Sequence, residues 1–232
     1  MRISLLLPLF LAWFASGSVA RAEERYYIVL FGSQSTPRLA RYTHTWATFV
    51  KTSGEGEGED ASEKHIDETF TISWMPADMR VRALRLFPQQ GVNLDLETTL
   101  AFAQERQRVS EWGPFQISKT IYDRAVERKA QLESGAVRYK AVDPNFGPRA
   151  ATISDCIHGI SDIDPENGRR YYTETRRFGE AASHWLGYQF VTRGQRVNPS
   201  ENLDWLNERL KLDNYPIVRR PPPERRVWLL DR

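Results

Sequence analysis

The stretch "THTWATFVK", residues 43–51, alternates polar and apolar side chains along most of its length. Successive side chains of a β-strand point to opposite faces of its sheet, so this alternation predicts a strand. One face carries His44, Trp46, Thr48 and Val50, and the other carries Thr45, Ala47 and Phe49. A second alternating stretch, "ETFTISWM" at 68–75, follows after a polar segment. We expect the two stretches to pair as an antiparallel hairpin.

The segment between these strands, residues 52–67, contains a Gly-Glu repeat and almost nothing apolar to bury. Such a composition cannot offset the entropy of ordering, so we expect a solvated, mobile hairpin tip. The alternative of a calcium loop is weaker, because the carboxylates lack the spacing that would wrap a cation.

Outside the hairpin, the pattern predicts strands and then mainly helices. Further strands are expected at 25–31, 80–88 and 136–142, and a turn at 112–115. Helices are expected from Asn93 or Asp95 to about Val109, from Ser118 to Gly135, at 178–191 and at 198–210. In the second helix, Ile121, Tyr122, Ala125, Val126 and Leu132 should face inward. The fold class is therefore α+β, with a small, mainly antiparallel sheet packed with helices.

The first 22 residues resemble a secretory signal peptide. Arg2 precedes a leucine-rich run, and Ala20 and Ala22 occupy the small-residue positions of a cleavage site, so the mature chain is expected to begin at Glu23. The apolar run is too short to span a membrane, and no later transmembrane segment is expected. We therefore expect an exported protein, periplasmic or extracellular, with one domain at 23–218 and a Pro/Arg-rich arm at 219–232.

Composition excludes several classes of function. The formal net charge is +2, and loss of Arg2 and Arg21 with the signal peptide would bring it near zero, which does not favour a nucleic-acid surface. The chain has no Gly-rich phosphate loop and no CxxC pair, so no cofactor is expected. The number of aromatic residues favours a packed globular body.

The only cysteine, Cys156, lies in "ATISDCIHGISD" at 151–162. A single cysteine in an exported protein is either buried and inert or retained for its chemistry. Asp155 or Ser154 can cap a short helix that ends before Pro165, which would place Cys156 in the first turn. The helix dipole and unpaired N–H groups there favour a thiolate with a lowered pKa.

A nucleophilic cysteine needs a base, and the expected strand places His44 where a rigid sheet can hold its ring. His158 would point away from Cys156 on a helix and can instead pair with Asp162. A metal site built on His158 and Asp162 lacks further ligands at a recognisable spacing, so no metal is expected. The alternative for His44 is a half-buried histidine with no catalytic role.

The order of His44, a polar residue on the next strand and then Cys156 resembles the circularly permuted papain-like cysteine hydrolases and acyltransferases. "DCIH" at 155–158 is similar to that group's Asn-Cys-x-His segment, and the resemblance spans roughly Tyr26 to Asp164. It implies Cys156 as nucleophile, His44 as base, and Thr71 or Ser73 as the third residue.

The resemblance also implies a reaction. The thiolate would attack an amide or ester carbonyl of a peptide, cell-wall or acyl-containing substrate while backbone N–H groups bind the oxyanion. On this basis we expect Cys156 to face His44 across a cleft between sheet and helix. The competing interpretation is a non-enzymatic exported binding module on the same fold, and the sequence does not determine the oligomeric state.

Overall fold

The architecture is taken from a computed structural model, which describes residues 23–37, 39–54, 65–105, 107–141, 152–164, 178–192 and 203–222. Its centre is a five-stranded sheet in the order β3-β2-β1-β6-β9. The strands are β1 (Glu23–Gln34), β2 (Thr43–Gly54), β3 (His65–Ile72), β6 (Arg108–Ile117) and β9 (Ile217–Arg220). Neighbouring strands are antiparallel except β6 and β9, which run parallel.

The expected hairpin is confirmed. β2 and β3 pair antiparallel, with Ala47 opposite Ile72 and Phe49 opposite Phe70. β2 continues beyond the predicted end to Gly54, and β3 begins earlier than predicted, at His65. The second expected strand is too long at its other end, because β3 ends at Ile72 and Trp74 and Met75 belong to a separate strand, β4 (Trp74–Pro76). Residues 55–64 of the expected tip lie outside the described residues.

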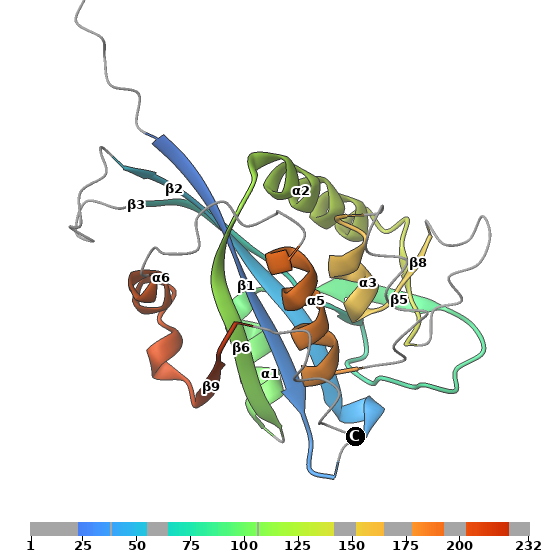
Figure 1. Ribbon diagram of the computed structural model, residues 1–232. Coiled ribbons are helices and arrows are strands. Elements are labelled where there is room, and N and C mark those ends of the chain that lie inside the picture. The colour runs from blue at the N-terminus through green and yellow to red at the C-terminus, as the bar shows by residue number, and fades with distance from the viewer. Residues whose placement is uncertain are drawn as a thin grey trace, which may run out of the picture.

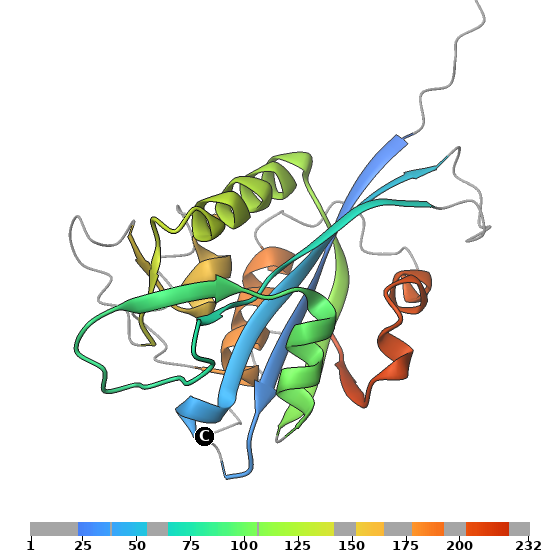
Figure 2. The same cartoon turned by 180° about the vertical axis from the view of Figure 1, so that it is seen from behind.

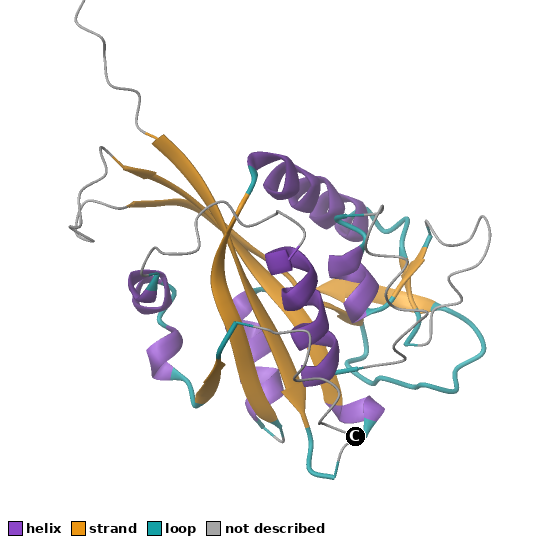
Figure 3. Ribbon diagram, viewed as in Figure 1, coloured by secondary structure: helices purple, strands orange, loops and turns teal. Residues whose placement is uncertain are grey.

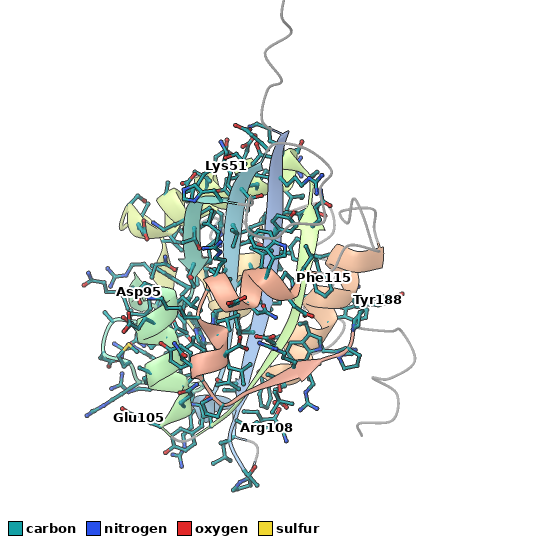
Figure 4. All side chains as sticks on the ribbon, turned by 90° about the vertical axis from the view of Figure 1, so that its left-hand side faces the viewer. Lys51, Asp95, Glu105, Arg108, Phe115 and Tyr188 are labelled. Atoms are coloured by element: carbon teal, nitrogen blue, oxygen red, sulfur yellow. The ribbon has the colours of Figure 1, made fainter. Side chains whose placement is uncertain are left out.

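Helices cover both faces of this sheet (Figures 1 and 2). One face carries α2 (Lys119–Glu133), α3 (Cys156–Ser161) and α5 (Glu180–Thr192), while the other carries α1 (Leu96–Gln104) and α6 (Asp204–Arg209). Figure 4 shows the same division from the side, with Asp95 and Glu105 at the two ends of α1 and Tyr188 of α5 across the sheet from them. Short 3-10 turns lie at Ala40–Tyr42 and Leu212–Asn214.

Alternation along β1 supplies a core on each face. Ile28 and Leu30 join the cluster under α2, α3 and α5, whereas Val29 and Phe31 join the cluster under α1. All four side chains are fully buried, and each such burial stabilises the fold by roughly 1.5–3 kcal/mol. β1 is therefore apolar on both faces because it lies at the centre of three layers.

A second, four-stranded sheet lies beside α3 and has the order β4-β5-β7-β8. Its strands are β4 (Trp74–Pro76), β5 (Gln89–Asn93), β7 (Arg138–Tyr139) and β8 (Ile153–Ser154). The indole of Trp74 lies against Gly91, where an added Cβ would be 2.0 Å from the ring. Only glycine fits there, and this contact fixes β4 on β5.

The expected strand at 80–88 is wrong. Residues 77–88 form a loop between β4 and β5 (Figure 3), and the sheet resumes only with β5 at Gln89. The side chain of Arg82 pairs with Asp78 at 2.5 Å, and the Nε of Arg85 donates to the carbonyl of Phe87 at 3.2 Å. These local contacts close turns, and no described element packs on the apolar side chains to hold a strand.

The expected turn at 112–115 is also wrong, because β6 runs straight through it. Gly113 has a φ of 105°, which only glycine adopts readily, and the register of β6 against β1 shifts at this point. The Gly-Pro pair therefore marks a bulge within the strand. The preceding helix is capped by Asp95 as expected, but it ends at Gln104 rather than near Val109, which is a buried residue of β6.

The remaining expectations hold in part. Ser118 caps α2 as expected, but Val126 is exposed and Arg128 is buried in its place. The strand expected at 136–142 is only β7, and Arg219 and Arg220 of the expected arm belong to β9. Residues 1–22, 198–202 and 223–232 lie outside the described residues. The expected signal peptide, the start of the last expected helix and most of the expected arm fall in these ranges.

Candidate functional site

Cys156 begins α3, as the sequence predicts. The carboxylate of Asp155 accepts hydrogen bonds from the backbone N–H groups of Ile157 and His158, each at 2.8 Å, so it caps the helix. α3 packs at Gly159 against β4 of the second sheet, where an added Cβ would be in van der Waals contact with the Cβ of Trp74, 3.4 Å away. The cap and this packing fix the position of the thiol.

The thiol itself is held in its neutral form. Cys156 is half-buried and packs against the cluster that contains Ile28 and Ala47. Burial and the negative charge of Asp155 raise the pKa of Cys156 to about 12, and hydrogen bonds from backbone N–H groups, including that of Thr45, only partly oppose them. The expectation of a lowered pKa is therefore wrong, because desolvation outweighs the favourable groups at the helix start.

His44 lies on β2 in a fully enclosed position. Its Nε2 is 2.8 Å from the Oγ of Ser73, and its ring stacks on Trp46 with centroids 5.3 Å apart. Burial lowers the pKa of His44 to about 3, so the imidazole is neutral at physiological pH. Of the two candidates for a third residue, the structure brings Ser73 to the histidine, while the hydroxyl of Thr71 lies 2.9 Å from that of Thr48.

The side chains of His44 and Cys156 lie on opposite faces of β2. His44 shares a face with Trp46, which packs in the cluster under α1. Cys156 packs in the cluster under α3 and α5, on the face that Ala47 and Phe49 share. The structure therefore joins His44 to Ser73 but does not place the imidazole and the thiol on the same face of the sheet.

Thr45, rather than His44, occupies the cysteine's face of β2. Its hydroxyl donates to the carbonyl of Gly179 at 3.3 Å and accepts from Ser183 of α5 at 3.1 Å. Its backbone N–H hydrogen-bonds to Cys156. The alternation in "THTWATFVK" already separates Thr45 from His44, so the sequence carried the signal that the two side chains point apart.

A buried arginine holds α3 in place, and sequence reasoning missed it. The Nη2 of Arg128 donates to the Oγ of Ser154 at 2.9 Å, the carbonyl of His158 at 3.3 Å and the carboxylate of Asp162 at 3.1 Å. Arginine is rarely buried without such partners. The sequence did contain a signal. Arg128 lies three residues after Ala125 and four before Leu132, which places it on the inward face of α2.

The structure gives His158 and Asp162 other partners than the pairing that the sequence predicts between them. The Nδ1 of His158 lies 3.0 Å from the carboxylate of Asp155, and Asp162 pairs with Arg128. Within the described ranges, no cluster of three or more His, Cys, Asp or Glu side chains has a metal-binding arrangement.

Comparisons with known proteins add no relative. No family model matches this chain, and neither the curated proteins nor the solved structures contain a significant match. In the described part of the chain, no helix has the length and apolar character needed to span a membrane.

Proposed function

We propose that this chain is an exported binding module in which Cys156 and His44 are packing residues. The observation that carries this proposal is the placement of the two side chains on opposite faces of β2, each uncharged through burial. A nucleophile and its base need hydrogen-bond reach of each other. Here each group instead has a structural task on its own face of the sheet.

The structural tasks can be named. Cys156 fills the start of α3 against the apolar cluster, where a small, weakly polar side chain is well suited. His44 lies at the start of β2 beside Trp46 and hydrogen-bonds to the buried hydroxyl of Ser73. The resemblance to permuted papain-like proteins stays a prediction from the sequence. On this proposal the chain is a member of that group without a catalytic Cys-His pair.

A second candidate is a thiol hydrolase that cleaves amide or ester bonds of peptide, cell-wall or acyl substrates. It is favoured by one observation: the Nδ1 of His44 is buried and has no hydrogen-bond partner among the described residues. Buried unsatisfied nitrogens are uncommon in folded proteins. In this candidate, a shift of β2 or α3 brings the two side chains together, and the Nδ1 of His44 takes the proton of the thiol. The thiolate attacks the carbonyl, the C–N or C–O bond breaks, and the imidazolium returns the proton to the departing amine or alcohol. Water then hydrolyses the thioester and frees Cys156.

The rate of alkylation separates the two candidates. Part of Cys156 is accessible to solvent, so iodoacetamide can approach it, and the chain has no other thiol to confuse the readout. A packing thiol with a pKa near 12 should alkylate far more slowly at neutral pH than free cysteine, and His44→Ala should leave that rate unchanged. Fast alkylation that slows in His44→Ala would support the hydrolase and reject the binding module.

A further inference from the structure

The loop between β4 and β5, residues 77–88, exposes large apolar side chains. Leu84, Leu86 and Phe87 are 95%, 79% and 76% exposed, whereas the other exposed large apolar side chains of the described residues are at most 40% exposed. Figures 1 and 3 show this loop projecting from the molecule beyond β5. Three such residues within four positions form an apolar tip that no part of the described chain covers.

Positive charge accompanies the apolar tip. The loop contains Arg80, Arg82 and Arg85 and a single acidic residue, Asp78. The carboxylate of Asp78 pairs with Arg82 at 2.5 Å, and the loop as a whole keeps an excess of positive charge. The loop therefore presents leucine and phenylalanine side chains close in sequence to three arginines.

The base of the loop is fixed to the body of the protein. The N–H of Ala77 donates to the carbonyl of Gln90 at 2.9 Å, and that of Met79 donates to the carbonyl of Pro76 at 2.8 Å. The side chain of Arg82 also reaches Gln89 at 3.3 Å. A tip on an anchored base loses little conformational freedom when it binds a surface.

We propose that the β4–β5 loop docks this protein onto an anionic lipid bilayer, with Leu84, Leu86 and Phe87 entering the headgroup region. Interfacial segments combine apolar side chains with arginines that contact lipid phosphates, as this loop does. A stable protein interface uses roughly 20–30 residues on each side, far more than one projecting loop offers. The inference is independent of whether Cys156 reacts.

Sedimentation with lipid vesicles tests this proposal directly. The purified protein should bind vesicles rich in phosphatidylglycerol, and binding should fall sharply on pure phosphatidylcholine and at high salt. The triple substitution Leu84→Ser, Leu86→Ser and Phe87→Ser should weaken binding by at least roughly tenfold. Its matched control is Val126→Ser with Val218→Ser, which removes exposed apolar side chains from α2 and β9 and should leave binding unchanged.

A charge series completes the test. Arg80→Gln with Arg85→Gln should weaken binding about fivefold or more per arginine. Arg138→Gln with Arg209→Gln removes the same charge from exposed positions elsewhere and should have a much smaller effect. Thermal melts establish that each variant is folded, which is expected because the substituted side chains are exposed.

Three results would overturn the proposal. The first is binding by the triple serine variant that equals wild type, and the second is equal binding to charged and neutral vesicles. The third is an absence of vesicle binding together with self-association that the triple variant abolishes in sedimentation velocity. That last result would assign the loop to contact between two copies of the chain.

Discussion

Substitution of His44 by glutamine should flatten the pH dependence of stability in mildly acidic solution. Burial lowers the pKa of His44 from 6.5 to about 3, so between these values the unfolded chain takes up a proton that the folded chain does not. The contribution of neutral His44 is therefore complete above pH 6.5 and is lost as the pH falls toward 3. The side chain is almost fully enclosed, so solvent does not reduce the effect.

The magnitude follows from the pKa shift. Linkage between proton binding and folding gives a loss of about 2 kcal/mol of unfolding free energy between about pH 7 and pH 5 from this residue alone. The assay is urea unfolding of wild type and His44→Gln across that range, read as the difference between their slopes against pH. His65→Gln, at an exposed histidine, is the matched control and should keep the wild-type slope.

The reasoning is refuted if wild type and His44→Gln lose stability in parallel as the pH falls. That result would mean that the imidazole is protonated in the folded protein, either through solvent access or through an anionic partner. It would also contradict the claim that burial keeps His44 uncharged, which the proposed function requires of both His44 and Cys156.

Further predictions concern the packing of α3 and the second sheet, and urea unfolding checks each. Arg128→Ala leaves the carboxylate of Asp162 without its buried partner and should cost about 3–5 kcal/mol, whereas Lys129→Ala, which loses only a surface pair, should cost less than about 1 kcal/mol. Asp155→Ala removes the cap of α3 and should cost about 1–2 kcal/mol; an unchanged midpoint would show that the cap does not stabilise the fold. Gly91→Ala forces a methyl group against Trp74 and should cost at least about 1–3 kcal/mol, and wild-type stability would contradict the contact described between β4 and β5.

Local patterns predicted the hairpin and the caps well. Alternation identified β2 and β3, and the caps at Asp95, Ser118 and Asp155 are present because an Asp or Ser side chain satisfies helix N–H groups wherever the helix begins. These features depend on residues close in sequence. They are therefore readable from the chain alone.

Features that depend on distant residues were not predicted. The loop at 77–88 resembles a strand in composition, but whether an apolar run is buried depends on what packs against it. The Gly113–Pro114 pair resembles a turn, but pairing with β1 on both sides of it, at Trp112 and at Phe115, carries the strand through.

The candidate site shows the same limit. Helix-start position alone indicated a lowered pKa for Cys156, whereas the surrounding core and the charge of Asp155 raise it. The opposite facing of Thr45 and His44 was written in the alternation of β2. The sequence did not indicate which face of the five-stranded sheet α3 would cover.

The most direct test of the central claim is the ionisation of Cys156, followed by the ultraviolet absorbance of the thiolate as the pH rises. Cys156→Ser supplies the baseline, since the chain contains only one thiol. A packing thiol predicts no thiolate signal at or below the free-thiol pKa of about 8.5, in wild type and in His44→Ala alike. A thiolate step below that value in wild type, lost or moved upward in His44→Ala, would contradict the account and establish Cys156 and His44 as a catalytic pair.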